Sequence, residues 1–395
     1  MRLLDKYLIT SSVFAIFTED FSFHYLIDLK LFYVILITNL FIISYKYKLT
    51  AHKNLVILIG FFLVHGIVSY LLFQNPIQSL IAQLIGITLS SIYFYNLIKI
   101  FSSKVLIEKY LQLSFIIAVL AIPMFYLDIN VFIYNRLNGI LSEPAHYAAI
   151  MLPATYLFLR KKQYLQLGII VCTIFLSRSS IGFIGLFLIL ILPLLKVKYF
   201  LKYSIIVVIL LTVFGFYLST KWNEKISENE SNVLVRRLKQ TTETFSATYT
   251  GKFKNYTNLS TYAFLSNFFI TQQIFTHKPL GTGLGSYKYE YEKYYDNLSP
   301  PKYLITLKQS KINKTDANSL FLRIIADFGI FGFLMIFYFF YRSYNVFRKD
   351  SKVIQQSTFF YLILKLIREG HYFPPEFYFF LLIFLKNSNE DIAYS

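Results

Sequence analysis

Residues 54–73, NLVILIGFFLVHGIVSYLLF, decide the fold class, because they form an apolar run with one histidine and no carboxylate, lysine or arginine. A helix needs roughly 20 such residues to cross the hydrocarbon core of a bilayer. A second run, IQSLIAQLIGITLSSIYFYNLI at residues 77–98, follows after a three-residue turn. The two runs predict a pair of antiparallel membrane helices.

The composition of the whole chain agrees with this interpretation. Of the 395 residues, 56% are apolar and 15% are charged, whereas about 25% of a soluble domain is charged. The 42 Phe and 33 Tyr residues add to an apolar surface that a soluble core of this size could not hide. We therefore predict an all-α integral membrane protein that crosses the bilayer several times.

About twelve segments are apolar enough to be transmembrane helices. They are residues 7–18, 26–45, 54–73, 77–98, 110–128, 144–159, 163–177, 180–195, 200–219, 318–341, 356–370 and 374–385. The first is read as an uncleaved span, because no small-residue cleavage site follows its apolar part. The chain is thus predicted to have helices one to nine in residues 1–220, a long polar loop in 221–317, and helices ten to twelve in 318–395.

Every second connector between the predicted spans is basic, which places these connectors in the cytoplasm. The basic residues concerned are Lys46, Lys48, Lys53, Lys99, Lys104, Lys109, Arg160, Lys161, Lys162, Lys196, Lys198, Lys202, Arg342, Arg348, Lys349 and Lys352. Both termini are then cytoplasmic, and the long loop lies on the opposite side of the membrane. The same topology accounts for most of the net charge of +18, so we expect no nucleic-acid partner.

The long loop is predicted to be partly helical. One amphipathic stretch covers residues 232–245, and a more apolar helix covers residues 261–275. The sole tryptophan, Trp222, stands where the ninth span would leave the membrane, as an interfacial anchor should.

Four arginines lie in or beside the predicted spans on the non-cytoplasmic side: Arg136, Arg178, Arg323 and Arg368. A charge in this position is costly and is taken as functional by default. Guanidinium groups can hold a diphosphate through paired hydrogen bonds. Each arginine could instead extend from a helix end to lipid headgroups, although the positive-inside bias argues against this for all four together.

Acidic and histidine side chains lie close to these arginines. Glu143 precedes Pro144 at the start of a span and could be a helix cap or a site residue. Asp316 is seven residues before Arg323 and is expected on the same helical face, or else as a cap. His371 lies three residues after Arg368, above it if the helix continues; it could be a base, an acid, a headgroup contact or a structural histidine.

A glycine-rich segment, GTGLGS at residues 281–286, resembles a phosphate-binding loop but lacks the preceding strand and the GKS or GKT ending of nucleotide sites. Gly281, Gly283 and Gly285 could still let the backbone approach a sugar or phosphate, or simply form a tight turn. Tyr287 and the tyrosines after it could stack on sugars, although tyrosines are also common at membrane interfaces. The single Cys172 and the scattered histidines predict no metal site.

Several of these segments together resemble the O-antigen polymerase and O-antigen ligase superfamily of bacterial envelope polysaccharide assembly. They are RLNGILSEP at residues 136–144, HKPLGTGLGS at 277–286, DANSLFLRIIADFG at 316–329 and REGHY at 368–372. No single motif is specific, and the resemblance lies in their order, spacing and common placement over residues 100–380.

This resemblance implies glycosyl transfer at the periplasmic face of the bacterial inner membrane, from a polyprenyl-diphosphate-linked oligosaccharide. It implies no cofactor and no metal, and it implies membrane lipids, a chain-length regulator and a flippase as partners. Arg136, Arg323 and Arg368 would hold the diphosphate, with Arg178, the glycines and Tyr287 as further substrate contacts. Glu143, Asp316 or His371 would accept the proton of the attacking hydroxyl.

One departure from the family favours an O-antigen or capsule polymerase over a ligase. Ligases of this family carry a His-Asn pair at the start of the span after the long loop, where this chain has Asn318 and Ser319. The rival function is a flippase or other transporter of the same lipid-linked saccharide. The long external loop, the lack of similar halves and the charges at one face argue against a transporter.

Overall fold

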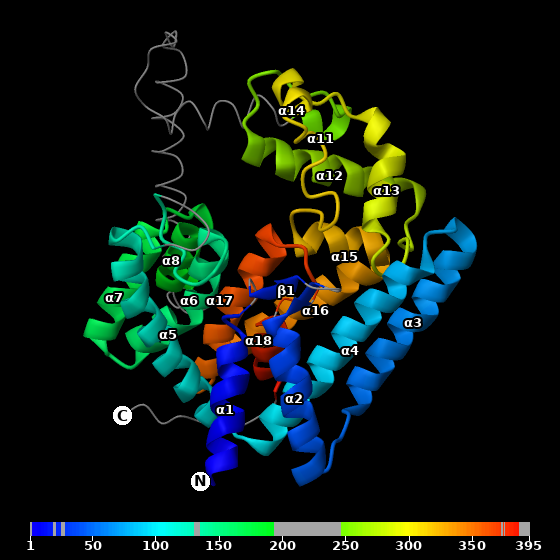
Figure 1. Cartoon of the computed structure of the whole chain (residues 1–395). Coiled ribbons are helices and arrows are strands. Elements are labelled where there is room, and N and C mark those ends of the chain that lie inside the picture. The colour runs from blue at the N-terminus through cyan, green and yellow to red at the C-terminus, as the bar shows by residue number, and fades with distance from the viewer. Residues whose placement is uncertain are drawn as a thin grey trace.

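The computed structural model describes residues 2–18, 21–24, 28–129, 135–192, 246–372, 374 and 376–386 (Figure 1). The predicted span at 200–219, the predicted amphipathic helix at 232–245 and Trp222 lie outside the described residues. The described parts are largely helical, and helices close in sequence pack side by side as an array with a smaller unit above it.

The first five helices are α1 (Leu3–Ala15), α2 (Leu31–Lys46), α3 (Lys53–Phe73), α4 (Ile77–Ile100) and α5 (Ser103–Tyr126). They correspond to the first five predicted spans. A short antiparallel hairpin of β1 (Ser22–His24) and β2 (Asp28–Lys30) precedes α2. The described elements are otherwise helical, as predicted, and the second helix begins at Leu31 because Asp28–Lys30 pair with β1 as a strand.

The next three helices are α6 (Pro144–Arg160), α7 (Tyr164–Leu176) and α8 (Ser180–Ile191). Pro144 stands at the first position of α6, where its missing N–H is no loss. Pro153 interrupts the hydrogen bonds inside α6, and the hydroxyl of Tyr110 from α5 donates to the carbonyl of Ile150 and accepts from the amide of Ala154 over 3.2 Å. The tyrosine thus bridges the backbone where the proline disturbs it.

Four of the described helices are long and apolar enough to cross a membrane, namely α3, α4, α5 and α16 (Ile330–Phe347). Three shorter apolar helices, α2, α7 and α8, accompany them. Only 17% of the apolar window of α3 is buried inside the protein, so the remainder presents aliphatic side chains outward. Exposed apolar surface of this extent suits contact with lipid, and the chain has the character of an integral membrane protein.

The centre of the array is formed by α6 and α17 (Val353–Arg368), which pack against each other. Thirteen of the 17 residues of α6 are buried, and thirteen of the 16 of α17. The last helix, α18 (Phe377–Leu385), packs on α17 and α4. The site described below lies at one end of this central pair.

Residues 246–317 form a small helical unit at the end of the array, seen at the top of Figure 1. Its helices are α11 (Ala247–Thr250), α12 (Leu259–His277), α13 (Tyr287–Tyr294), the 3₁₀ turn η3 (Tyr295–Asn297) and α14 (Lys302–Thr306). They surround a core of their own that includes Tyr262, Phe269 and Tyr291. The predicted helix at 261–275 is therefore confirmed as α12.

The predicted single span at residues 318–341 was wrong, because the segment forms two helices, α15 (Leu320–Phe328) and α16. Gly329 separates them with φ of 56° and ψ of −128°, a conformation that glycine adopts without steric cost. The amide of Ile330 donates to the carbonyl of Pro279 over 2.9 Å. Leu322 and Ala326 of α15 belong to the core of the 246–317 unit, so burial against that unit turns α15 away from α16.

Candidate functional site

A cavity of about 360 Å³ lies where the central helix pair meets the 246–317 unit. Its walls come from the first turns of α6 and α8, from residues 312–318 before α15, and from the end of α17 with the turn after it. The polar residues that line it are Glu143, His146, Asn313, Asp316, Asn318, Lys365, Arg368, Glu369 and His371. The structure thus brings together four of the predicted site residues: Glu143, Asp316, Arg368 and His371.

The segment before α15 fixes the carboxylate of Asp316 by an irregular backbone. Asn313, Ala317 and Asn318 all have φ near +58°. Asp316 accepts hydrogen bonds from the Asn313 side chain over 3.3 Å and from the Asn318 amide over 3.2 Å. The predicted shared helical face of Asp316 and Arg323 was wrong, since α15 begins only at Leu320, and Ser319 is the residue whose side chain caps it.

Asp316 faces His371 across the cavity, with 3.7 Å between Oδ2 of the carboxylate and Nε2 of the ring. Desolvation by the surrounding protein lowers the pKa of His371, while the negative charge of Asp316 acts in the opposite direction. The histidine is therefore a neutral hydrogen-bonding group near pH 7.

Arg368 is the last residue of α17 and His371 lies in the turn after it, so these residues do not stack on one helical face as predicted. Arg368 is exposed at the cavity and forms no hydrogen bond or ion pair with any residue that the structure describes. Glu143 is also exposed there, and its side chain makes no capping bond to α6. Both side chains are thus open to a ligand.

Arg323 lies behind the turn and does not line the cavity. It is 4% exposed, its Nη1 donates to the carbonyl of Gly370 over 2.8 Å, and its guanidinium stacks over the ring of Tyr372 at 4.5 Å. Asp327 lies 3.8 Å from its Nε. In the described structure Arg323 therefore holds the turn that presents Arg368 and His371.

Two further predicted arginines lie outside the cavity. Arg136 donates from Nε to the carbonyl of Ser177 over 3.1 Å and from a terminal nitrogen to the carbonyl of Arg178 over 3.0 Å. These carbonyls end α7, where a cation is favourable. Arg178 itself is exposed in the turn between α7 and α8.

The glycine-rich segment packs onto the end of α15. Gly281, Gly283 and Gly285 have φ of 88°, 95° and 80°, and a Cβ at Gly281 would lie 2.5 Å from the carbonyl oxygen of Asp327. The amides of Thr282 and Gly283 donate to that same oxygen over 3.1 and 2.9 Å. This loop is therefore a tight turn that caps α15.

The side chain of Asp327 completes the contact with the glycine-rich segment. Its carboxylate accepts from the amides of Gly285 and Tyr287 over 3.0 and 3.2 Å, and from the hydroxyl of Tyr372 over 3.0 Å. Burial raises the pKa of Asp327, although Arg323 and these bonds oppose the shift. Tyr287 is fully buried and donates to Asn267 over 2.7 Å, which places it in the core of the 246–317 unit.

The sequence did not single out a cluster of buried charges beside the cavity. Lys365 of α17 forms a close ion pair with Glu369 and lies 3.5 Å from Glu376. Glu369 also lies 3.4 Å from Nε2 of His146, and Tyr361 donates to Glu376 over 2.6 Å. The sequence did carry a signal for this cluster. Lys365 lies inside an apolar run, and an ionisable residue in such a position is taken as functional by default.

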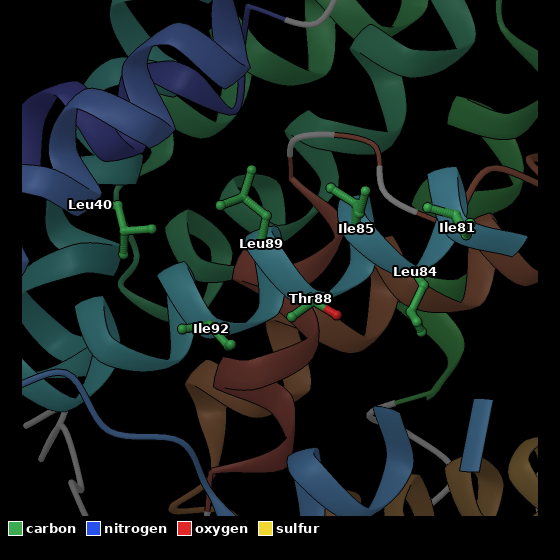
Figure 2. A pocket seen from close by; sticks show the side chains of 7 residues that line it. All are labelled: Leu40, Ile81, Leu84, Ile85, Thr88, Leu89 and Ile92. Atoms are coloured by element: carbon green, nitrogen blue, oxygen red, sulfur yellow. The ribbon is translucent and has the colours of Figure 1, made fainter. Parts of the chain in front are cut away.

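The described structure has neither catalytic side chains in its other groove nor a cluster of metal ligands. A second groove of about 350 Å³ lies between α2 and α4, and six of its seven lining residues are leucine or isoleucine, with Thr88 as the only hydroxyl (Figure 2). Among the described residues, no group of three or more His, Cys, Asp and Glu side chains is placed to hold a metal ion.

Comparison with known proteins connects this site to one family. Residues 165–337 match the model of the O-antigen ligase family. The comparisons with curated proteins and with solved structures gave no match. The matched range includes the 246–317 unit, α15 and the first eight residues of α16, and therefore Asp316 and Asn318 of the cavity. The match covers less than half of the chain, and it shows that this part of the chain is similar to the O-antigen ligase family.

Proposed function

We propose that this protein is a membrane glycosyltransferase that transfers a glycan from a polyprenyl diphosphate to a new lipid-linked repeat unit. The observation that carries the proposal is the cavity at the end of α6 and α17, which joins an exposed arginine to carboxylates and histidines. The family match supports the class of reaction, because O-antigen ligases act on lipid-linked oligosaccharides.

The residues in the cavity suit both substrates of such a transfer, the donor with its leaving diphosphate and the acceptor sugar. Arg368 presents a planar guanidinium that can hold the leaving diphosphate through two parallel hydrogen bonds. Asp316 on the opposite wall and His371, three residues after Arg368, offer hydrogen-bond acceptors to the sugar that receives the glycan. A preorganised cation beside the breaking bond stabilises charge as it develops on the diphosphate.

The remaining predicted arginines have supporting roles in this proposal. Arg323 fixes the turn that carries Arg368, and Arg136 fixes the turn between α7 and α8, from which Ile181 reaches the cavity. The substrate contacts of Arg178, Gly281, Gly283, Gly285 and Tyr287 stay predictions; in the described structure these residues do not line the cavity.

The proposal includes a location. We place the protein in the bacterial inner membrane with about twelve spans, with both termini in the cytoplasm and the cavity at the periplasmic face. A flippase would deliver the lipid-linked repeat unit, and a chain-length regulator would act beside the polymerase. Support comes from the basic connectors that the structure describes, which lie at the opposite ends of the helices from the 246–317 unit.

A ligase is the second candidate, because the matched family model is described as an O-antigen ligase. The residues at the ligase His-Asn position favour the polymerase. Asn318 lines the cavity, while the hydroxyl of Ser319 donates to the carbonyl of Leu366 over 2.7 Å and caps α15. Neither residue is a base, so the acceptor hydroxyl needs a proton acceptor from elsewhere in the cavity.

Purified protein in proteoliposomes with a lipid-linked repeat unit as the only substrate tests the proposal. A polymerase gives a ladder of products that differ by one repeat. A ligase gives no ladder and forms product only when lipid A core is added. A flippase changes the side of the membrane on which the saccharide is accessible and forms no new glycosidic bond; this last result would overturn the proposed function.

A further inference from the structure

Glu369 lines the cavity and carries a carboxylate oxygen that the protein leaves without a partner. The residue is 8% exposed. Its Oε2 is paired with Lys365 and lies 3.4 Å from His146, whereas its Oε1 is buried and accepts no hydrogen bond from any described residue. A buried carboxylate oxygen without a hydrogen bond is costly, which calls for a ligand that donates to it.

Glu369 belongs to a buried cluster of charges. Lys365 and Glu376 are each 1% exposed, and with Glu369 they place two carboxylates around one ammonium group. One ammonium group cannot neutralise both carboxylates, so this set carries one excess negative charge.

We propose that Glu369 is the catalytic residue that accepts the proton of the attacking sugar hydroxyl, and that Lys365 is a positioning residue that holds it. The inference rests on the proposed function and names the base that the cavity otherwise leaves open. The acceptor hydroxyl would donate to Oε1, the oxygen that accepts no hydrogen bond from any described residue.

The transfer step balances with these groups. The hydroxyl oxygen of the acceptor forms a bond to the anomeric carbon of the donor glycan. The bond from that carbon to the diphosphate oxygen breaks, and its electron pair leaves with the diphosphate. The hydroxyl proton moves to Oε1 of Glu369 and from there to water at the cavity mouth. Lys365 keeps its proton throughout, so that Glu369 returns to its charged form.

Three substitutions separate this role from a structural one. Glu369→Gln keeps the shape of the side chain and removes its basicity, and the lost proton transfer should lower the rate of polymer formation by about 10²–10⁴-fold. Lys365 keeps Glu376 as a counter-charge in this variant, so the fold should persist. Glu369→Asp keeps the negative charge and replaces the Gln variant in the test if that protein does not accumulate. Its side chain is one methylene shorter, which moves the carboxylate away from the acceptor hydroxyl, so this variant should also form polymer slowly. Glu292→Gln is the matched control, because Glu292 pairs with Lys311 and Lys314 at the surface of the 246–317 unit.

Rescue by formate gives a readout that a structural role would not move. Glu369→Ala in proteoliposomes should regain part of its rate when sodium formate supplies a carboxylate to the vacated space, whereas Glu292→Gln should not respond. A Glu369→Gln protein with the wild-type rate would overturn the inference, and so would a slow Glu369→Ala protein that formate leaves unchanged. If the wild-type protein forms no glycosidic bond, the proposed function fails. If the wild-type protein is active and the Glu369 variants are equally active, the proposed function stands and only this inference fails.

Discussion

Arg323 and Gly370 are joined by a 2.8 Å hydrogen bond from the guanidinium Nη1 to the backbone carbonyl, across 47 residues of chain. This contact ties α15 to the turn after α17, and the same turn presents Arg368 and His371 to the cavity. Gly370 also lies so close to Asp316 that a Cβ there would be 1.4 Å from the Asp316 carbonyl oxygen. The two walls of the site are therefore locked together through backbone contacts.

Gly370→Ala should abolish activity by separating these walls. A methyl group cannot occupy this space, so either the turn or the segment around Asp316 must move. Displacing a reactive group by about 1 Å can cost on the order of 10²-fold in rate. Product ladders from vesicles with matched protein amounts measure the effect. Gly60→Ala is the control, because a Cβ there meets nothing within 4 Å; an active Gly370→Ala enzyme would show that the contact is dispensable.

Arg368→Lys should lower the transfer rate by about 10²–10³-fold, because lysine offers a point charge and no planar pair of donors. If Arg368 only contacts lipid headgroups, lysine should serve as well. Initial rates in proteoliposomes decide between the two. Arg160→Lys, at the other end of α6 and exposed, controls for the general effect of the substitution. Full-length ladders from the Arg368→Lys protein would remove this residue from the diphosphate site.

Gly281→Ala should destabilise the protein by about 1–3 kcal/mol or more, the usual cost of forcing extra atoms into a packed region. Its φ of +88° is unfavourable for alanine, and the Cβ would approach the carbonyl oxygen of Asp327 to 2.5 Å. Thermal unfolding in detergent, compared with Gly168→Ala, measures the difference. Gly168 lies in α7 with open space around it, and its replacement should be neutral or stabilising. Equal unfolding temperatures would contradict the capping role of the loop.

Glu290 should make the attachment of the 246–317 unit to the α3–α4 turn sensitive to acid. Burial alone would raise its pKa, but bonds from Lys278, Lys293 and Asn75 outweigh burial and lower the pKa below 4.5. A lowered folded-state pKa stabilises the folded form above pH 4.5, and this stabilisation is lost as the pH falls through the lowered value.

Hydrogen exchange of residues 278–295, corrected for the intrinsic pH dependence, tests this expectation. Protection should fall in wild type as the pH is lowered below 4.5, and it should be low and independent of pH in this range in Glu290→Gln. Glu292→Gln, which leaves Glu290 in place, should respond like wild type. The same acid response in Glu290→Gln would assign the effect to another group.

Reporter fusions test the membrane orientation. Fusions at Asn255 and Asn297 should report the periplasm, and fusions at Lys162 and Lys352 the cytoplasm, because basic connectors are retained inside. A cytoplasmic signal from Asn297 would place the cavity on the wrong face for a polyprenyl-linked donor.

The positions of most described helices could be predicted because membrane helices need long apolar runs, and charged connectors mark their ends. The span predicted at 144–159 is α6 at 144–160, since Pro144 and the basic run at Arg160 delimit it. The break at Gly329 could not be predicted in the same way. Residues on both sides of it are apolar, and the break depends on Leu322 and Ala326 packing into a core contributed by residues far away in sequence.

The candidate site could likewise be predicted only in part. Asp316, Arg368 and His371 were found because charged residues near a membrane face stand out against apolar neighbours. Lys365 and Glu369 line the same cavity, but their pairing with each other depends on the geometry at the end of α17. The roles of Arg323 and the glycine-rich loop could not be predicted, since both are defined by backbone carbonyls that the sequence does not distinguish.

The burial of α6 has a consequence for how the protein tolerates mutation. Lipid accommodates any aliphatic side chain, so exchanges among Leu, Ile, Val and Phe on the outer face of α3 should have little effect. α6 contacts protein on almost all sides and includes Ala148, Ala149 and Ala154 among its buried residues, where larger side chains have no space. Sequence drift among relatives should therefore be rapid on α3 and slow on α6.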